Sequence, residues 1–189
     1  MVRQRMPEVK FRRKHELARK DMLMLMRIAD TLPGNGAKQP ATASDHVGSY
    51  VPETGPRVIR VLIVDDHDLI RVGMHSILSR VDGIAVVGEC TDGNQVLAAV
   101  GVGAGTPDVV LMDRQMPITS GAEATRALLA AHPTARVLMM SVAGTDDVVR
   151  EAAAAGAVGF LIKNGNPGQL IAAVRAIATG DHAWRGRPG

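Results

Sequence analysis

The stretch Val58-Ile59-Arg60-Val61-Leu62-Ile63-Val64-Asp65-Asp66 decides the fold. It joins an apolar, mostly β-branched run of strand length to two consecutive carboxylates, which is typical of a buried strand that ends at a polar edge. Four further apolar runs of strand length follow, at residues 84–88, 109–112, 136–140 and 159–162.

Helical patterns alternate with these runs. We expect helices at residues 68–80, 94–100, 122–131, 146–155 and 167–179. In the first, Leu69, Val72, Ile77 and Leu78 are expected on the buried side. Asn166 is expected to cap the last helix. Five βα repeats predict an α/β fold, a doubly wound parallel sheet with helices on both faces, and ligands bind such sheets outside the carboxyl ends of the strands.

Charged and hydroxyl side chains follow these strands at that edge. Asp65 and Asp66 follow the first, Asp113 the third, Ser141 the fourth and Lys163 the fifth. Carboxylates that crowd together repel, so Lys163 and a divalent cation are expected to balance them, and Mg²⁺ suits such oxygen ligands. A neutralised carboxylate can attack phosphorus. The set therefore predicts the formation and hydrolysis of an aspartyl phosphate.

Three motifs carry a resemblance to a known family. They are Val61-Leu62-Ile63-Val64-Asp65-Asp66-His67, Leu111-Met112-Asp113-Arg114-Gln115-Met116-Pro117 and Gly156-Ala157-Val158-Gly159-Phe160-Leu161-Ile162-Lys163. With them, residues 58–180 resemble the receiver domain of a two-component response regulator of the NarL/FixJ type. The resemblance implies a flavodoxin-like (βα)5 sheet with strand order 2-1-3-4-5.

The resemblance also implies a role for each residue of the phosphorylation site. Asp113 would accept a phosphoryl group from a sensor histidine kinase. Asp66, Asp113 and the backbone carbonyl of Gln115 would bind Mg²⁺ directly, and Asp65 would act through water. Ser141 and Lys163 would contact the phosphoryl oxygens.

Three further positions are implied to act around that site. Phe160 stands where the family keeps a rotating aromatic switch residue, and Gln115 and Ala143 would tune the lifetime of the phosphorylated form. The protein is therefore expected to be a signalling phosphoacceptor with Mg²⁺-dependent self-phosphorylation and autodephosphorylation, and not an enzyme with a separate substrate. Its output would be a partner protein or a second copy in a phosphorylation-linked homodimer.

The N-terminal region has a different composition. Residues 1–57 hold 11 Lys/Arg against 6 Asp/Glu, whereas residues 58–189 hold 11 against 13. Residues 1–32 are predicted to form a basic amphipathic helical arm, and residues 33–57, rich in Gly, Pro and Ala, a flexible linker. This arm is expected to dock, to dimerise or to pack on its own domain.

The C-terminal residues 181–189 form a short tail with no room for a recognition helix. Direct sequence-specific DNA binding is therefore not supported, and the chain is expected to be either a stand-alone receiver or a NarL-type transcriptional regulator truncated before its helix-turn-helix. A haloacid-dehalogenase-like phosphatase is a third hypothesis, because Asp66-His67-Asp68 has the Asp-x-Asp spacing of that class.

Composition excludes several other classes. The single cysteine, Cys90, excludes an intrachain disulfide and a multi-cysteine zinc site and is expected to be buried. Two Phe, one Tyr and one Trp leave few surfaces for base stacking. No apolar run reaches the length of a membrane span, and a cytoplasmic location is expected. His67 and His75 are interpreted as helix residues and not as metal ligands.

Overall fold

The computed structural model describes residues 57–101, 106–164 and 166–184. The predicted arm at 1–32 and the linker up to residue 56 lie outside the described residues. Five strands alternate with helices as predicted, and a sixth strand follows the last helix. The elements are β1 (Ile59–Val64), α2 (Asp68–Leu78), β2 (Ile84–Cys90), η1 (Gly93–Gln95), α3 (Val96–Gly101), β3 (Val109–Asp113), α4 (Gly121–Ala131), β4 (Val137–Ser141), α5 (Asp146–Ala154), β5 (Gly159–Ile162), α6 (Pro167–Thr179) and β6 (Ala183–Trp184).

The strands form one parallel sheet in the order β2-β1-β3-β4-β5-β6. The predicted order of the first five strands is confirmed. The sixth strand was not predicted, since two residues are too few for a periodic pattern. In β6, Ala183 pairs with Gly159 and Trp184 with Phe160, so β6 covers part of the outer edge of β5.

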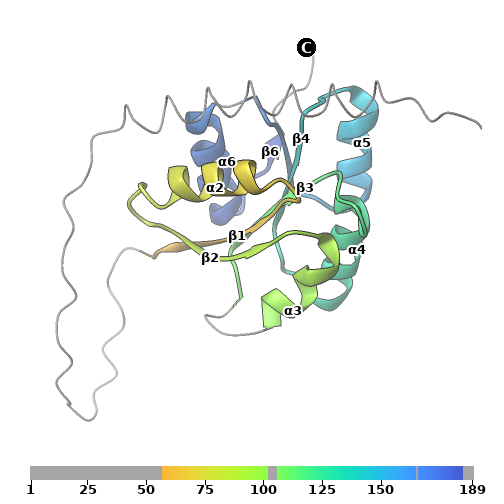
Figure 1. The fold of residues 1–189 in the computed structure, drawn as a ribbon, viewed down its shortest axis with the longest axis horizontal. Coiled ribbons are helices and arrows are strands. Elements are labelled where there is room, and N and C mark those ends of the chain that lie inside the picture. The colour runs from red at the N-terminus through yellow and green to blue at the C-terminus, as the bar shows by residue number, and fades with distance from the viewer. Residues whose placement is uncertain (1–56, 102–105, 165, 185–189) are drawn as a thin grey trace, which may run out of the picture.

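Helices cover both faces of the sheet, α2 and α6 on one side and α3, α4 and α5 on the other (Figure 1). Each face has its own buried cluster, because successive side chains of a strand point to opposite faces. In β1, Val61 and Ile63 pack toward α2 and α6, whereas Leu62 and Val64 pack toward α3 and α4. The sheet is therefore buried on both sides, which fixes the register of its strands.

The buried face of α2 differs from the prediction. Leu69 and Val72 are 51% and 60% exposed, so their predicted burial was wrong. The buried residues of this helix are Ile70, Met74, Ile77 and Leu78. At about 100° per residue these four lie within one arc, and Leu69 and Val72 lie outside it.

Local hydrogen bonds fix where two helices begin. Ser120 and Glu123 form a reciprocal capping box at the start of α4. Asn166 Oδ1 accepts from the backbone N–H of Gln169 at 3.2 Å, which confirms the predicted cap of α6. Within the described ranges no helix has the length and apolar character needed to cross a bilayer.

Candidate functional site

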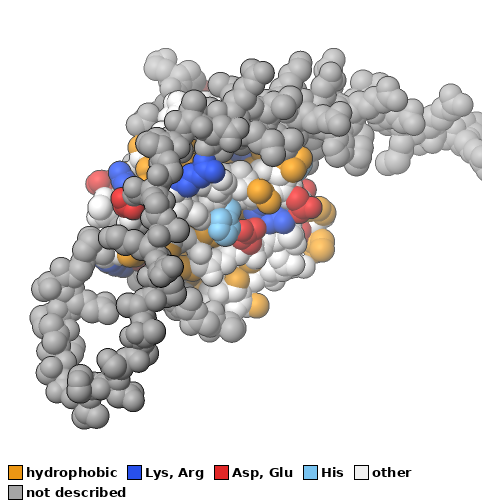
Figure 2. Space-filling model, turned by 60° about the vertical axis from the view of Figure 1, so that its left-hand side comes forward, with side chains coloured by type: hydrophobic (Ala, Val, Ile, Leu, Met, Phe, Trp, Pro, Cys, Tyr) orange, Lys and Arg blue, Asp and Glu red, His pale blue; other side chains and the backbone are white. Residues whose placement is uncertain are grey.

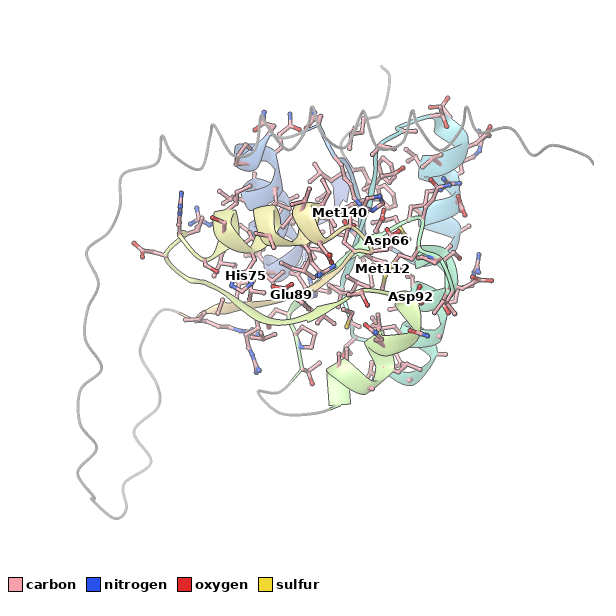
Figure 3. The ribbon with its side chains drawn as sticks, in the orientation of Figure 1. Asp66, His75, Glu89, Asp92, Met112 and Met140 are labelled. Carbon is pink, nitrogen blue, oxygen red and sulfur yellow. The ribbon has the colours of Figure 1, made fainter. Side chains whose placement is uncertain are left out.

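Four neighbouring strands bring the predicted site residues to one edge of the sheet. Asp65 and Asp66 follow β1, Asp113 ends β3, Ser141 ends β4 and Lys163 follows β5. Since these strands are parallel and adjacent, their carboxyl ends meet at the same edge. Figure 3 shows Asp66 at this edge, where the ends of β1 and β3 lie together.

Lys163 joins the first strand to the third. Its Nζ lies 2.6 Å from Asp65 Oδ2 and 2.9 Å from Asp113 Oδ1. The side chains of Lys163, Asp65 and Asp113 are only 9%, 0% and 7% exposed, so solvent screens these ion pairs weakly. One ammonium thus holds two carboxylates in a fixed arrangement.

The two paired carboxylates respond differently to this environment. Burial on its own would raise the pKa of Asp65, but the hydrogen bond with His67 and the charge of Lys163 outweigh it, so this pKa is lowered. The pKa of Asp113 is raised to about 6, chiefly by burial and also by the charges of Asp65 and Asp66, although Lys163 opposes the rise. Asp113 is therefore the carboxyl that loses its proton less readily.

Asp66 lies beside this pair and has a buried oxygen. Asp66 Oδ1 accepts no hydrogen bond from the described residues. Its neighbour is Nδ1 of His67, 2.8 Å away, and the same nitrogen lies 3.4 Å from Asp65 Oδ1. His67 is thus the N-cap residue that precedes α2, and its ring faces the acidic pair. His67 therefore stands at the start of α2 and not inside it, whereas His75 lies within α2, paired with Glu89 at 2.6 Å (Figure 3).

The arrangement fits a divalent cation. One potential ligand atom from each of Asp65, Asp66, His67 and Asp113 lies within 4.8 Å of the other three. The single ammonium of Lys163 pairs with only two of the three carboxylates, Asp65 and Asp113. The buried Oδ1 of Asp66 accepts no hydrogen bond from the described residues and needs a positive partner. Figure 2 shows acidic side chains directly beside basic side chains and a histidine on one face of the domain.

Ser141 lies on the strand between Asp113 and Lys163. It is buried, its Oγ accepts from the backbone N–H of Ala143 at 3.2 Å, and its carbonyl accepts from the backbone N–H of Lys163 at 2.8 Å. Ala143 and Gln115 are exposed on the loops that follow β4 and β3. Both loops therefore border the site without filling it.

Phe160 lies away from the carboxylates, on the face of β5 that packs toward α5. It is fully buried, in a cluster with Val148 and Ala152 of that helix. A Cβ built on Gly144, in the loop before α5, would lie 3.8 Å from Phe160 Cε1. The ring thus reaches the loop that begins just beyond Ser141.

Two residues that support the site were not singled out from the sequence. Buried Asp92 follows β2 and accepts from the backbone N–H groups of Ile118 and Thr119, at 2.9 and 3.1 Å, which holds the loop after β3. Arg71 of α2 donates to the carbonyl of Asp65 at 3.0 Å. An aspartate after a strand and an arginine in an amphipathic helix are common, so neither residue type by itself indicates a role at the site.

A glycine allows α4 to begin against the end of β3. A Cβ built on Gly121 would lie 2.1 Å from the carbonyl oxygen of Asp113. No larger residue fits there unless the backbone moves. The N–H of Gly121 donates to the carbonyl of Arg114 at 3.0 Å, which closes the loop that carries Gln115.

The geometry agrees with what comparison with known proteins finds. The family model of the response regulator receiver domain matches residues 61–175. The response regulator GacA of Pseudomonas viridiflava is 40% identical over 123 residues, which are 65% of this chain and 56% of that protein. YxjL of Bacillus subtilis (strain 168), named an uncharacterized transcriptional regulatory protein, is 38% identical over 127 residues, 67% of this chain and 57% of that protein.

A solved structure shows the same likeness. The signal receiver domain of the response regulator NarL from Mycobacterium tuberculosis is 36% identical, with a TM-score of 0.62, over 66% of this chain and 99% of that domain. The chain spans about half the length of the curated relatives it matches. Since the receiver model matches more than half of its residues and the sheet has the receiver strand order, the chain belongs to the response regulator receiver family.

Proposed function

We propose that this receiver is phosphorylated on Asp113 by a sensor histidine kinase. The observation that carries the proposal is the position of Lys163 Nζ, 2.6 Å from Asp65 and 2.9 Å from Asp113, with Asp66 alongside. This arrangement places a fixed positive charge beside the carboxylate that would attack phosphorus.

The residues present account for the reaction. An oxygen of Asp113 forms a bond to phosphorus, the bond from phosphorus to the donor breaks, and the donor leaves with the bonding electron pair. Lys163 would contact one phosphoryl oxygen and the Ser141 hydroxyl would donate to another. When bound, Mg²⁺ would neutralise the remaining phosphoryl charge, held directly by Asp66, Asp113 and the carbonyl of Gln115 and through water by Asp65.

Phosphorylation would switch the surface of the domain. If Ser141 moves toward the phosphoryl group, the loop that begins at Ala143 moves with it, and Phe160, whose ring reaches this loop, repacks. The change is a shift between two packings biased by local charge. Gln115 and Ala143, exposed beside the site, would set how easily water reaches the phosphoryl group and therefore its lifetime.

The output is proposed to be a change of partner, either another protein or a second copy of this chain, in the cytoplasm. Transcriptional regulation is a second candidate, favoured by the likeness to a transcriptional regulatory protein nearly twice the length of the matched region. We also propose that the receiver domain occupies residues 58–180, preceded by a basic arm at 1–32 and a linker at 33–57.

The direct test is labelling of the full chain with acetyl phosphate or phosphoramidate in the presence of Mg²⁺, followed by intact mass. The wild type is expected to gain one phosphoryl group, and Asp113→Asn none. Asp108→Asn is a matched control, because Asp108 precedes the same strand at its amino end and pairs there with Arg57. Stoichiometric labelling of folded Asp113→Asn, or none of the wild type, would refute the proposal.

A further inference from the structure

The imidazole of His67 lies within the carboxylate cluster, in direct contact with the acidic pair. Nδ1 is 2.8 Å from Asp66 Oδ1 and 3.4 Å from Asp65 Oδ1. The ring is 28% exposed, so its inner edge faces the carboxylates and part of it faces solvent. A nitrogen donor therefore sits among oxygen donors.

The local backbone explains this orientation. His67 occupies the N-cap position of α2 with an extended backbone, φ −95° and ψ 108°, yet its side chain makes no capping hydrogen bond to the helix. Its backbone N–H instead donates to Asp65 Oδ1 at 3.0 Å, which turns the residue toward the site. The same hydrogen bond orders the carboxylate and positions the ring beside it.

The spacing of these atoms matches the coordination shell of one ion. With metal–ligand bonds of about 2.1 Å, neighbouring ligands of an octahedron lie about 3 Å apart and opposite ligands about 4.2 Å apart. The contact of 2.8 Å between His67 and Asp66 fits a neighbouring pair, and the atoms of the four-residue cluster lie within 4.8 Å of one another. His67 Nδ1 and Asp66 Oδ1 are thus spaced as two neighbouring ligands of one ion, with Asp65 near enough to act through water.

We propose that His67 Nδ1 is a ligand of the cation site and that it gives the site a preference for Mn²⁺, Co²⁺ or Ni²⁺ over Mg²⁺. Mg²⁺ prefers oxygen ligands, whereas an imidazole nitrogen adds affinity for first-row transition ions, increasingly so from Mn²⁺ to Ni²⁺. This inference rests on the cation site of the proposed function. It concerns which ion the site selects and which residue makes the selection.

The test uses the full chain and titration calorimetry with Co²⁺ and with Mg²⁺ separately, at about pH 8, where a free imidazole is neutral. For His67→Asn we expect the Co²⁺ affinity to fall by about 10- to 100-fold, the range found for changes around metal ligands. The Mg²⁺ affinity should stay within a few-fold of the wild-type value. His75→Asn is the control, because His75 lies on the same helix and pairs with Glu89 of β2.

A spectroscopic readout separates direct coordination from an effect of the ring on its neighbours. In the wild type, bound Co²⁺ should give a paramagnetically shifted imidazole N–H resonance that persists in His75→Asn and disappears in His67→Asn. The Co²⁺ ligand-field band should move to longer wavelength when the nitrogen donor is lost.

The outcomes are distinguishable. Equal losses of Co²⁺ and Mg²⁺ affinity, or an unchanged Co²⁺ spectrum in His67→Asn, would overturn the role of His67 as a ligand and leave the cation site standing. If the folded wild type binds neither ion, the cation site of the proposed function fails as well. Retained Mg²⁺ affinity in His67→Asn shows that the variant is folded.

Discussion

Replacement of Asp113 by asparagine is expected to stabilise the protein at neutral pH when divalent cations are absent. Asp113 is buried, and its pKa is raised to about 6, first by burial and then by the charges of Asp65 and Asp66. Asparagine has nearly the same volume and carries no charge to desolvate. Lys163 keeps its ion pair with Asp65 at 2.6 Å, so the substitution leaves no unpaired ammonium.

The direction in which stability changes with pH follows from the protons bound by the folded and the unfolded protein. Between about pH 4 and 6 folded Asp113 retains a proton that the unfolded chain has released, so stability decreases as pH rises through this range. Above about pH 6 Asp113 is ionised in the folded protein, and the full free-energy cost of burying its charge lowers the stability. A rise from an ordinary pKa near 3.9 to about 6 corresponds to about 3 kcal/mol of unfolding free energy. Asp65 has a lowered pKa and contributes to the unfolding free energy with the opposite sign, but it is present in both the wild type and Asp113→Asn.

Urea unfolding followed by far-UV circular dichroism, with a chelator present, measures this difference. The stability of Asp113→Asn relative to wild type should increase by up to about 3 kcal/mol between pH 4 and pH 8. Added Mg²⁺ should reverse the order, because it stabilises the protein that binds it better. The exposed Asp82→Asn serves as control. A difference that stays constant across the pH range would refute the reasoning.

Three further substitutions test the support of the site. Lys163→Met leaves Asp65 and Asp113 without their shared ammonium, and urea unfolding should show a loss of about 3–5 kcal/mol near neutral pH and a smaller loss near pH 4. Asp92→Ala removes the acceptor for two amides of the loop after β3. This substitution should lower the unfolding free energy by about 3 kcal/mol and speed the hydrogen exchange of those amides, whereas unchanged exchange would contradict the role of Asp92. Gly121→Ala places a Cβ 2.1 Å from the Asp113 carbonyl, so calorimetry should show Mg²⁺ affinity at least about tenfold weaker.

Most of the site could be predicted because it depends on topology. Once alternating strands and helices indicate a parallel sheet, side chains that follow neighbouring strands must meet, however far apart they are in sequence. Lys163 and Asp65 are 98 residues apart, yet both were expected at this edge. The motifs around Asp113 then gave the set a chemical role.

Features that depend on side-chain orientation could not be predicted in this way. The apolar residues of α2 allow two overlapping stripes, and only packing against the sheet selects Ile70 and Met74 over Leu69 and Val72. The inward turn of His67 depends on its backbone hydrogen bond to Asp65. The strand β6 exists because the open edge of β5 offers it partners, and two residues carry no such information by themselves.

The long separation of Asp65 and Lys163 also bears on how the chain folds. The carboxylates of β1 emerge early during synthesis, but the ammonium that contacts them lies 98 residues later and follows β5. Before β5 is in place, the acidic edge lacks this partner, and sheet pairings between distant segments form slowly. The ion-pair cluster is thus completed only at a late stage of folding. A nascent or partly folded chain that still lacks β5 would present these carboxylates without the ammonium that pairs with them in the finished sheet.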